Sequence, residues 1–363
     1  MISGGGTGGH IFPALAIANA IKDKYAGSEF LFVGAIGKME MEKVPAAGYK
    51  IIGLPITGIA RSLSLKNFFF PFKLLKSIRI SKKLIKEFKP DVVVGVGGFA
   101  SGPLLYAASK MGIPTLIQEQ NSYPGITNKI LSKRVDKICV AYDGMEQFFP
   151  KDRIRFTGNP IRKDITNLSG KRERGLENFG FDGSKKILFV TGGSLGSKTL
   201  NECTAAALSQ LEENKIQLLW QTGLSYADQA QQLLKNFPQL KVVCVPFIKE
   251  MDYAYAIADV VISRAGAGAL SELCMVHKAC ILVPFPFAAE DHQTKNAQAL
   301  VTHKAAIMIN DSEAHGKLFV AAIDLLVNDE ERQRLEDNIS KLAVYDAAET
   351  IASEVYNLAK GKQ

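Results

Sequence analysis

Gly4-Gly5-Gly6-Thr7-Gly8-Gly9 stands ahead of a helical stretch near the start of the chain, and Phe189-Val190-Thr191-Gly192-Gly193-Ser194-Leu195-Gly196 repeats that arrangement in the second half. Around them, short β-branched runs alternate with amphipathic helical segments, which is typical of a parallel α/β fold. A chain of 363 residues exceeds what one hydrophobic core usually supports. We therefore expect two tandem Rossmann-like domains rather than an array of repeats.

The expected strands form one group in each half of the chain. In the first half they cover residues 30–33, 91–96, 114–117, 137–141 and 154–157, and in the second half residues 186–191, 217–221, 242–245, 260–263, 279–283 and 306–309. Only Met1-Ile2-Ser3 precedes the first glycines, so a first strand there would be unusually short.

The boundary between the domains is expected near Gly158-Asn159-Pro160-Ile161-Arg162, where a strand ends in turn-forming residues and proline prevents its continuation. This gives an N-terminal domain of residues 1–159 and a C-terminal domain of residues 160–341. Charged helical stretches at 329–342 and 347–360 close the chain, and we expect residues 342–363 to return to the N-terminal domain. The polar, glycine-spaced segment 170–184 is predicted to be a surface excursion.

The composition, with 47% hydrophobic and 22% charged residues, is that of an ordinary globular protein. No run of about 18 apolar residues occurs, so no membrane-spanning helix is predicted, and the lack of a secretory leader predicts a cytoplasmic protein. The five cysteines, odd in number and without a Cys-x-x-Cys pair, are interpreted as small buried hydrophobes. The net charge of +8 indicates an anionic partner, whether nucleic acid, membrane or substrate.

The first glycine loop satisfies the G-x-G-x-x-G pattern of dinucleotide-binding folds, but that pattern alone is weak. The same folds carry an acid about 20 residues later, at the end of the second strand, to hold a ribose. Here that strand runs into Gly34-Ala35-Ile36-Gly37, which contains no acid. We therefore predict that the loop lets the phosphate or sugar of another molecule approach the backbone closely.

A second glycine loop, at residues 95–103, follows a strongly apolar strand and precedes a helix that starts near Pro103. Neither loop ends in Gly-Lys-Ser/Thr, which argues against a P-loop ATPase. Two such loops in one domain predict that an anionic group, such as a diphosphate, lies over both helix starts.

The most informative stretch is Val260-Val261-Ile262-Ser263-Arg264-Ala265-Gly266-Ala267-Gly268-Ala269-Leu270-Ser271-Glu272. A buried strand ends in a loop of very small residues, and the helix that follows carries a carboxylate one turn in. Such a loop allows a diphosphate to sit on the helix N-terminus, and Glu272 is placed to pair with two ribose hydroxyls. The alternative, a capping carboxylate in the first turn, leaves the small residues unexplained.

Downstream, Pro284-Phe285-Pro286-Phe287 leads into Glu290-Asp291-His292-Gln293-Thr294-Lys295-Asn296. This cluster of polar side chains at another helix start can pair with the hydroxyls of a hexose, because each buried polar group needs a partner. The preceding strand and prolines hold the cluster at the carboxyl edge of the sheet, where open α/β folds bind ligands.

Taken together, these motifs resemble the MurG family, the N-acetylglucosaminyltransferases of peptidoglycan synthesis with the GT-B fold. The resemblance runs in the right order from residue 2 to about residue 303. It is carried by residues 4–10, 97–103, 119–121, 158–162, 192–194, 247–251, 263–272 and 291–293. It implies two Rossmann-like domains with parallel sheets facing each other across a cleft.

The resemblance also implies a donor, UDP-N-acetylglucosamine, and an acceptor, lipid I, which is an undecaprenyl-diphosphate-linked N-acetylmuramyl pentapeptide converted to lipid II. In the C-terminal domain Ile248 would contact the uracil and Glu272 the ribose. The diphosphate would be contacted by Ser194, Ala267, Gly268, Ala269 and Leu270, and Ser271 would belong to the same donor site. Arg162 and Arg264 would lend positive charge, His292, Gln293 and Asn121 would bind the sugar, and Thr7, Gly8 and Gly9 would reach it from the opposite domain.

The implied reaction is attack of the acceptor C4 hydroxyl on the anomeric carbon with inversion, while UDP leaves. Helix N-termini and arginines would stabilise the departing diphosphate, so we expect neither a metal nor another cofactor, and the sequence contains no Asp-x-Asp motif. A histidine side chain ordinarily titrates near neutrality, so His10 is the expected base. The alternatives are that His10 only steadies the turn before Pro13, and that Glu119 is the base or orients the acceptor.

The basic charge is concentrated between residues 61 and 89, where cations interleave with aromatic residues. The aromatic residues are Phe68, Phe69, Phe70 and Phe72, and the cations are Arg61, Lys66, Lys73, Lys76, Arg79, Lys82, Lys83, Lys86 and Lys89. Such a segment is typical of a peripheral site on an anionic membrane, here the inner face of the cell membrane. An amphipathic helix packed on its own sheet is the alternative, and no nucleic-acid-binding module is recognised.

Two other kinds of function remain open from the sequence. The first is another GT-B enzyme, such as a glycolipid glycosyltransferase or a UDP-sugar epimerase. The second is a non-catalytic, membrane-docked protein that binds nucleotide sugars, although the presence of His10 and Glu119 argues against it.

Overall fold

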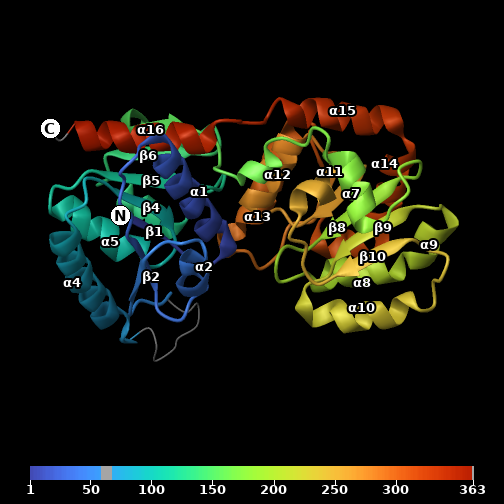
Figure 1. Ribbon diagram of the computed structural model, residues 1–363, viewed down its shortest axis with the longest axis horizontal. Coiled ribbons are helices and arrows are strands. Elements are labelled where there is room, and N and C mark those ends of the chain that lie inside the picture. Colours follow the sequence, from blue (N-terminus) through green and yellow to red (C-terminus); the bar gives the residue numbers. More distant parts are fainter. Residues whose placement is uncertain (59–67, 362–363) are drawn as a thin grey trace. The chain divides into compact units, whose positions relative to one another are not determined.

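The computed structural model describes residues 1–58 and 68–361, which form two compact units (Figure 1). Unit 1 comprises Met1–Arg162 and Asp346–Gln363, and unit 2 comprises Lys163–Tyr345. The chain therefore passes from one unit to the other twice. The first passage lies three residues after the predicted boundary at 159/160, and the second four residues after the predicted boundary at 341/342.

Unit 1 is built on a seven-stranded sheet with the order β3-β2-β1-β4-β5-β6-β7, in which every neighbouring pair is parallel. Its strands are β1 (Ile2–Gly4), β2 (Phe32–Ala35), β3 (Ile51–Leu54), β4 (Val93–Gly97), β5 (Thr115–Glu119), β6 (Lys137–Val140) and β7 (Ile154–Phe156). Its helices are α1 (Gly8–Lys24), α2 (Glu40–Ala46), α4 (Phe70–Phe88), α5 (Ser101–Lys110), α6 (Ile126–Leu131) and α16 (Ala347–Lys360).

Both faces of the unit 1 sheet are buried, because successive strand residues pack into different clusters. Val93 packs with Leu84 of α4 and Leu104 of α5, whereas Val94 packs with Ile11 of α1 and Ile351 of α16. Continuous apolar strands are the expected consequence of burial on two faces.

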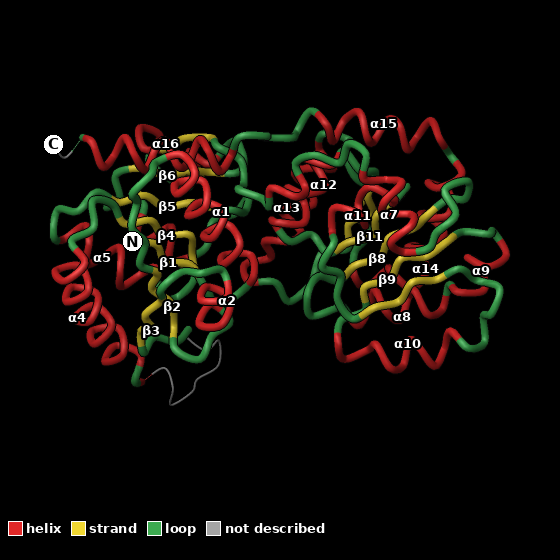
Figure 2. The backbone as a smooth tube through the Cα atoms, in the orientation of Figure 1, coloured by secondary structure: helices red, strands yellow, loops and turns green. Residues whose placement is uncertain are grey.

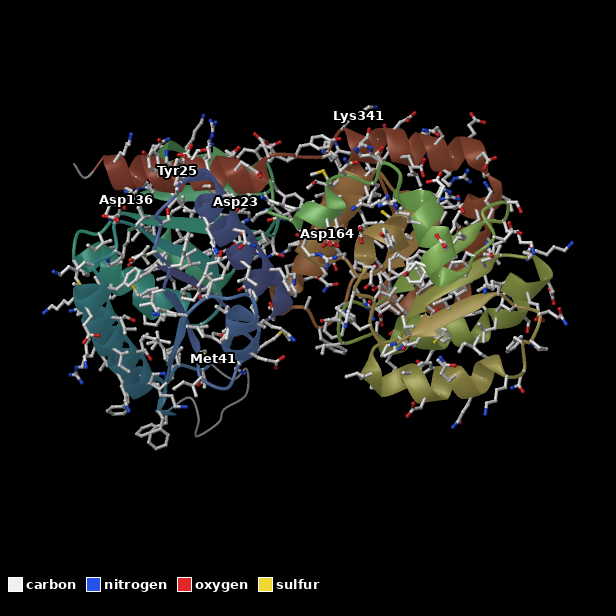
Figure 3. The ribbon with its side chains drawn as sticks, viewed as in Figure 1. Asp23, Tyr25, Met41, Asp136, Asp164 and Lys341 are labelled. Carbon is white, nitrogen blue, oxygen red and sulfur yellow. The ribbon has the colours of Figure 1, made fainter. Side chains whose placement is uncertain are left out.

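The last helix, α16, belongs to unit 1 and packs along α1 (Figure 2). Tyr25, labelled in Figure 3, stacks on Tyr356 of α16 with ring centroids 4.0 Å apart. The structure thus places the C-terminal helix on the domain to which we expected it to return.

Unit 2 is built on a six-stranded parallel sheet with the order β10-β9-β8-β11-β12-β13. Its strands are β8 (Ile187–Thr191), β9 (Gln217–Gln221), β10 (Val242–Val245), β11 (Val260–Ser263), β12 (Cys280–Leu282) and β13 (Ile307–Met308). Its helices are α7 (Lys171–Phe179), α8 (Lys198–Ala206), α9 (Leu208–Glu213), α10 (Ala227–Leu234), α11 (Met251–Ile257), α12 (Ala267–Val276), α13 (His292–Thr302), α14 (Ala314–Val327) and α15 (Asp329–Ser340).

Short 3-10 turns complete the two units. They are η1 (Met145–Gln147), η2 (Lys151–Arg153), η3 (Lys163–Ile165), η4 (Leu224–Tyr226), η5 (Ala289–Asp291) and η6 (Asp311–Glu313). No helix within residues 1–58 and 68–361 has the length and apolarity needed to cross a membrane.

The segment 170–184, predicted as a surface excursion, does lie mostly at the surface, but it is not an irregular segment. Much of this segment forms α7, which packs on α11 so closely that a Cβ at Gly175 would lie 2.7 Å from Ile257 Cγ2. Lys171 pairs with Asp252 of α11 at 2.8 Å. The helix is held by a glycine contact and an ion pair rather than by an apolar stripe, so its composition resembles that of a loop.

Candidate functional site

The glycine loops predicted from the sequence lie where the strand order of each sheet reverses. In unit 1 the order changes direction between β1 and β4, and in unit 2 between β8 and β11. Open α/β folds bind ligands at the carboxyl ends of the strands that flank such a reversal. The loops after β1, β4, β8 and β11 are the four glycine-rich stretches, so each unit has one candidate site.

In unit 1 the two glycine loops touch each other. A Cβ at Gly98, whose φ is +87°, would overlap the carbonyl oxygen of Gly5. Thr7 is the N-cap of α1 and Gly8 and Gly9 form its first turn, with no side-chain cap among the described residues. Amides at a helix start without a side-chain cap are a common binding site for anions in other proteins.

His10 lies in the first turn of α1, with its imidazole against the second loop. Its Nδ1 lies 3.0 Å from the carbonyl oxygen of Gly5 and 3.4 Å from the Thr7 hydroxyl. Because a carbonyl oxygen only accepts, Nδ1 carries the proton in the neutral ring and Nε2 holds the lone pair. A Cβ at Gly97 would lie 2.7 Å from Nε2, so a glycine is needed where the ring rests. This tautomer suits a general base that acts through Nε2.

Glu119, the competing base, ends β5 and is 2% exposed. Its carboxylate accepts four hydrogen bonds, from Asn121 N at 3.1 Å, Asn121 Nδ2 at 3.1 Å, Gly125 N at 3.2 Å and Asn128 Nδ2 at 2.8 Å. Burial raises the pKa of Glu119, and these donors oppose the rise because they favour the charged form. A carboxylate so enclosed shapes the loop that carries Asn121, and the geometry favours His10 as the base.

In unit 2 the loop of small residues leads into α12 as expected. Gly266 is the N-cap of the helix, and no described side chain caps it. The first turn therefore contains backbone amides without a described side-chain partner, and its residues Ala267, Gly268 and Ala269 are very small. The Ser271 side chain folds back on the preceding turn of the helix, where its hydroxyl donates to the carbonyl oxygen of Ala267 at 3.0 Å. Leu270, also in this first turn, is buried.

Glu272 lies in the second turn of α12 and is partly buried. Its Oε2 accepts a 3.0 Å hydrogen bond from the hydroxyl of Tyr255 on α11. The tyrosine thereby orients the carboxylate that we expect to meet a ribose. Tyr255 was not identified from the sequence, where its place in an apolar helix gave no signal of this role.

The remaining residues predicted to bind the donor lie in a loop and at a helix start of unit 2 and, for Arg162, in unit 1. Ser194 is exposed in the turn after β8, next to Gly193 with its φ of +82°. His292 and Gln293 begin α13, where His292 Nδ1 lies 2.6 Å from the Ala289 carbonyl oxygen and Gln293 Oε1 accepts from the Phe285 amide at 2.9 Å. Arg162, half-buried, ends the first part of unit 1.

Arg264 is 9% exposed, and its guanidinium is shared among three loops. It donates to Ser197 Oγ at 2.9 Å, to the carbonyl oxygens of Val283 and Pro284 at 3.1 Å each, and to Asp311. These contacts join the ends of β8, β11, β12 and β13. Arg264 thus organises the carboxyl edge of the sheet, and its predicted contribution of charge to a diphosphate stays a prediction.

Gln221 was missed by the sequence analysis. It ends β9, is buried, and donates to Thr191 Oγ1 and the Gly193 carbonyl oxygen at 3.0 Å each. Its Oε1 accepts from the amide of Ile248 at 2.8 Å, so one side chain fixes both the Ser194 loop and the residue expected to meet uracil. The available signal was a polar residue directly after the apolar run 218–220.

The cationic and aromatic segment lies on α4 and the turn before it. Phe68, Phe69, Phe72 and Leu75 are 69%, 54%, 65% and 53% exposed, whereas Phe70 packs against the unit 1 core. The cations that we singled out there and that the structure describes are Lys73, Lys76, Arg79, Lys82, Lys83, Lys86 and Lys89. Arg61 and Lys66 lie outside the described residues.

No group of three or more His, Cys, Asp or Glu side chains that could hold a metal ion occurs in the part of the chain that the structure describes. The five cysteines are all buried.

Comparisons with known proteins match both units to one family. The glycosyltransferase family 28 N-terminal domain matches residues 1–140, and the C-terminal domain of the same family matches residues 187–351. A protein of Phocaeicola vulgatus is 52% identical over 360 residues, covering 99% of this chain and 96% of the relative. It is named UDP-N-acetylglucosamine--N-acetylmuramyl-(pentapeptide) pyrophosphoryl-undecaprenol N-acetylglucosamine transferase.

Solved structures show the same likeness. Acinetobacter baumannii MurG superposes with a TM-score of 0.79 at 29% identity, covering 98% of both chains. A UDP-N-acetylglucosamine 2-epimerase superposes with a TM-score of 0.67 at 14% identity, covering 100% of this chain and 96% of the other, which is a likeness of fold alone.

Proposed function

The chain belongs to glycosyltransferase family 28, and we propose that it transfers N-acetylglucosamine from UDP-N-acetylglucosamine to the C4 hydroxyl of the muramyl sugar of lipid I, giving lipid II. The observation that carries the proposal is 52% identity over 99% of the chain to a transferase that bears this activity in its name. The resemblance to the MurG family and the GT-B fold predicted from the sequence are both confirmed.

We assign the donor to unit 2. The start of α12 offers backbone amides and a favourable helix dipole to the diphosphate, and Glu272, held by Tyr255, is placed for the ribose. Gln221 fixes Ile248 and the Ser194 loop, so the parts expected to meet uracil and diphosphate share one rigid support. His292 and Gln293, fixed at the start of α13, would meet the sugar hydroxyls.

We assign the base to His10 of unit 1. Nε2 of the neutral imidazole takes the proton of the acceptor hydroxyl as its oxygen attacks the anomeric carbon, the bond to the diphosphate breaks, and the configuration inverts. The amides at the α12 start stabilise the charge that develops on UDP, so we propose that transfer needs no divalent metal. Activity that persists in EDTA supports this proposal, and loss of activity restored by Mg²⁺ refutes it.

The acceptor carries a polyprenyl chain, so we propose that the protein works at an anionic membrane on its cytoplasmic face. Support comes from the exposed Phe68, Phe69 and Phe72 beside the cations of α4. Aromatic residues exposed next to lysines suit a headgroup boundary better than a buried protein interface.

One assay tests the proposal against its rivals. The protein is incubated with UDP-N-acetylglucosamine, with or without a lipid I analogue, and UDP release is measured. Release that requires the acceptor supports the transferase. Interconversion of the sugar nucleotide indicates an epimerase, and binding without turnover a non-catalytic binder, so either result refutes the proposal.

The same assay tests the base. His10→Ala should lower kcat about 100-fold or more, the usual contribution of a general base, while the donor KM changes little. His303→Ala, which removes an exposed histidine of unit 2, is the matched control and should leave kcat unchanged. An unchanged rate for His10→Ala would reassign the base.

A further inference from the structure

A buried carboxylate lies directly beneath the first glycine loop. Glu40, the first residue of α2, is 1% exposed. Its Oε2 accepts from the Gly6 amide at 2.8 Å, and its Oε1 accepts from the Ala35 amide at 3.0 Å. The acid that the dinucleotide pattern requires at the end of the second strand is missing there, but five residues after that strand Glu40 reaches back to the loop.

Two glycines make room for this side chain. A Cβ at Gly34 would lie 2.6 Å from Glu40 Cγ, and a Cβ at Gly5 would overlap the carboxylate itself. Because glycine has no side chain, these two positions leave room for the buried carboxyl group of Glu40. Because Gly6 N–H already donates to Glu40, the loop binds an anion that belongs to the protein.

The same peptide group joins Glu40 to His10. The Gly6 N–H that donates to Glu40 and the Gly5 carbonyl that accepts from His10 Nδ1 are the two ends of one peptide bond. All described peptide bonds are trans, so these ends point in opposite directions, toward the acid and toward the imidazole. Two hydrogen bonds and one peptide group therefore connect the Glu40 carboxylate to the His10 imidazole.

Hydrogen bonds in such a chain polarise one another. An anion at the amide end increases the electron density on the carbonyl oxygen, which then accepts more strongly from Nδ1. A stronger bond at Nδ1 holds the ring in one tautomer and increases the basicity of Nε2, as a carboxylate does when it contacts the histidine directly.

We propose that Glu40 is a positioning residue that acts on His10 through the peptide bond joining Gly5 to Gly6. The inference rests on the proposed function for the role of His10 as base. The contacts themselves involve unit 1 alone. Glu40 does not touch the substrate in this scheme, and its effect is confined to the tautomer and basicity of the imidazole.

The test is ¹⁵N NMR of histidine-labelled protein without substrates, with the His10 signals identified by their loss in His10→Asn. In the wild type His10 should show a protonated Nδ1 and an unprotonated Nε2. Glu40→Gln should shift both signals toward a mixture of tautomers. Glu42→Gln, which neutralises a carboxylate with a 77% exposed side chain on the same helix, should leave them unchanged.

Kinetics provide the second measurement. Glu40→Gln should lower kcat about 10- to 100-fold, the usual effect of losing a carboxylate that orients a histidine, with the donor KM within about twofold of wild type. If Glu40→Gln does not fold, Gly34→Ala is used instead. The new Cβ would displace the Glu40 side chain without changing the charge of its carboxylate. This variant should shift the ¹⁵N signals of His10 in the same direction.

Unchanged His10 signals in the folded variant overturn the proposal, whatever the activity. A rise in donor KM without a fall in kcat overturns it as well. If the wild type shows no transfer at all, the proposed function fails, while the NMR comparison still decides whether Glu40 controls the imidazole.

Discussion

Asp311→Ala removes a carboxylate that pairs with the buried Arg264, and the structure indicates how large the effect on stability should be. The side chains of Arg264 and Asp311 are 10% and 20% exposed. Removing one partner of a buried pair costs about 3–5 kcal/mol, because it leaves an uncompensated charge. Arg264 keeps three other acceptors and the Asp311 side chain is partly exposed, so we expect the lower end, about 3 kcal/mol.

The single tryptophan of the sequence makes the measurement specific for unit 2. Trp220 lies on β9, is fully buried, and donates from Nε1 to Asn201 Oδ1 at 3.0 Å. Its fluorescence in urea therefore reports the unfolding of this unit. With a slope of about 2 kcal/mol per molar urea, a loss of about 3 kcal/mol lowers the midpoint by about 1.5 M.

Two further variants test whether the loss of stability in Asp311→Ala comes from the unpaired charge of Arg264. Asp329→Ala removes an exposed partner of Lys186 and should shift the midpoint little, because exposed pairs contribute little to stability. Adding Arg264→Met to Asp311→Ala removes the unpaired charge and should recover part of the loss. The reasoning is refuted if Asp311→Ala behaves like the Asp329→Ala control, or if the double variant recovers nothing.

Three other outcomes are expected. Glu272→Ala should weaken UDP binding about 10- to 100-fold in calorimetry, since hydrogen bonds to a charged group are worth about 1.5–3 kcal/mol, and an unchanged affinity would remove Glu272 from the site. Reversing the charge of Lys73, Lys76 and Arg79 should reduce co-sedimentation with anionic liposomes but not donor affinity; undiminished sedimentation would show that α4 is misread. Burial raises the pKa of Cys244 to about 11, and the other four thiols are also buried, so none should react with a thiol reagent at pH 8 until denaturant is added; rapid labelling of the folded protein would contradict this.

Most of the sheet architecture was predictable because its strands are continuous apolar runs. The bounds of β9, β10 and β11 agree with the prediction. β3 was missed because four residues with an internal glycine, Ile51-Ile52-Gly53-Leu54, carry no clear strand pattern. α7 was missed because a polar helix held by a buried glycine has the composition of a loop.

The candidate site was predictable where it depends on local backbone features and not where side chains contact one another across the fold. Small residues before a helix predict an anion site from the local sequence alone, so the loops near Gly8 and Ala267 were proposed from the sequence. The supporting contacts of Glu40, Gln221 and Asp311 join segments far apart in the sequence or in different strands. Nothing in the neighbourhood of each residue reveals its partner before the chain has folded.

The position of α16 affects how the protein is made on the ribosome. Unit 2 is one uninterrupted stretch, whereas the core of unit 1 includes Ile351, Ala352 and Val355 from the last helix. Translation therefore delivers every residue of unit 2 before it delivers the helix that covers α1. Until then the apolar residues of α1 that pack against α16 lack their partner, so the unit that is translated first completes its core last.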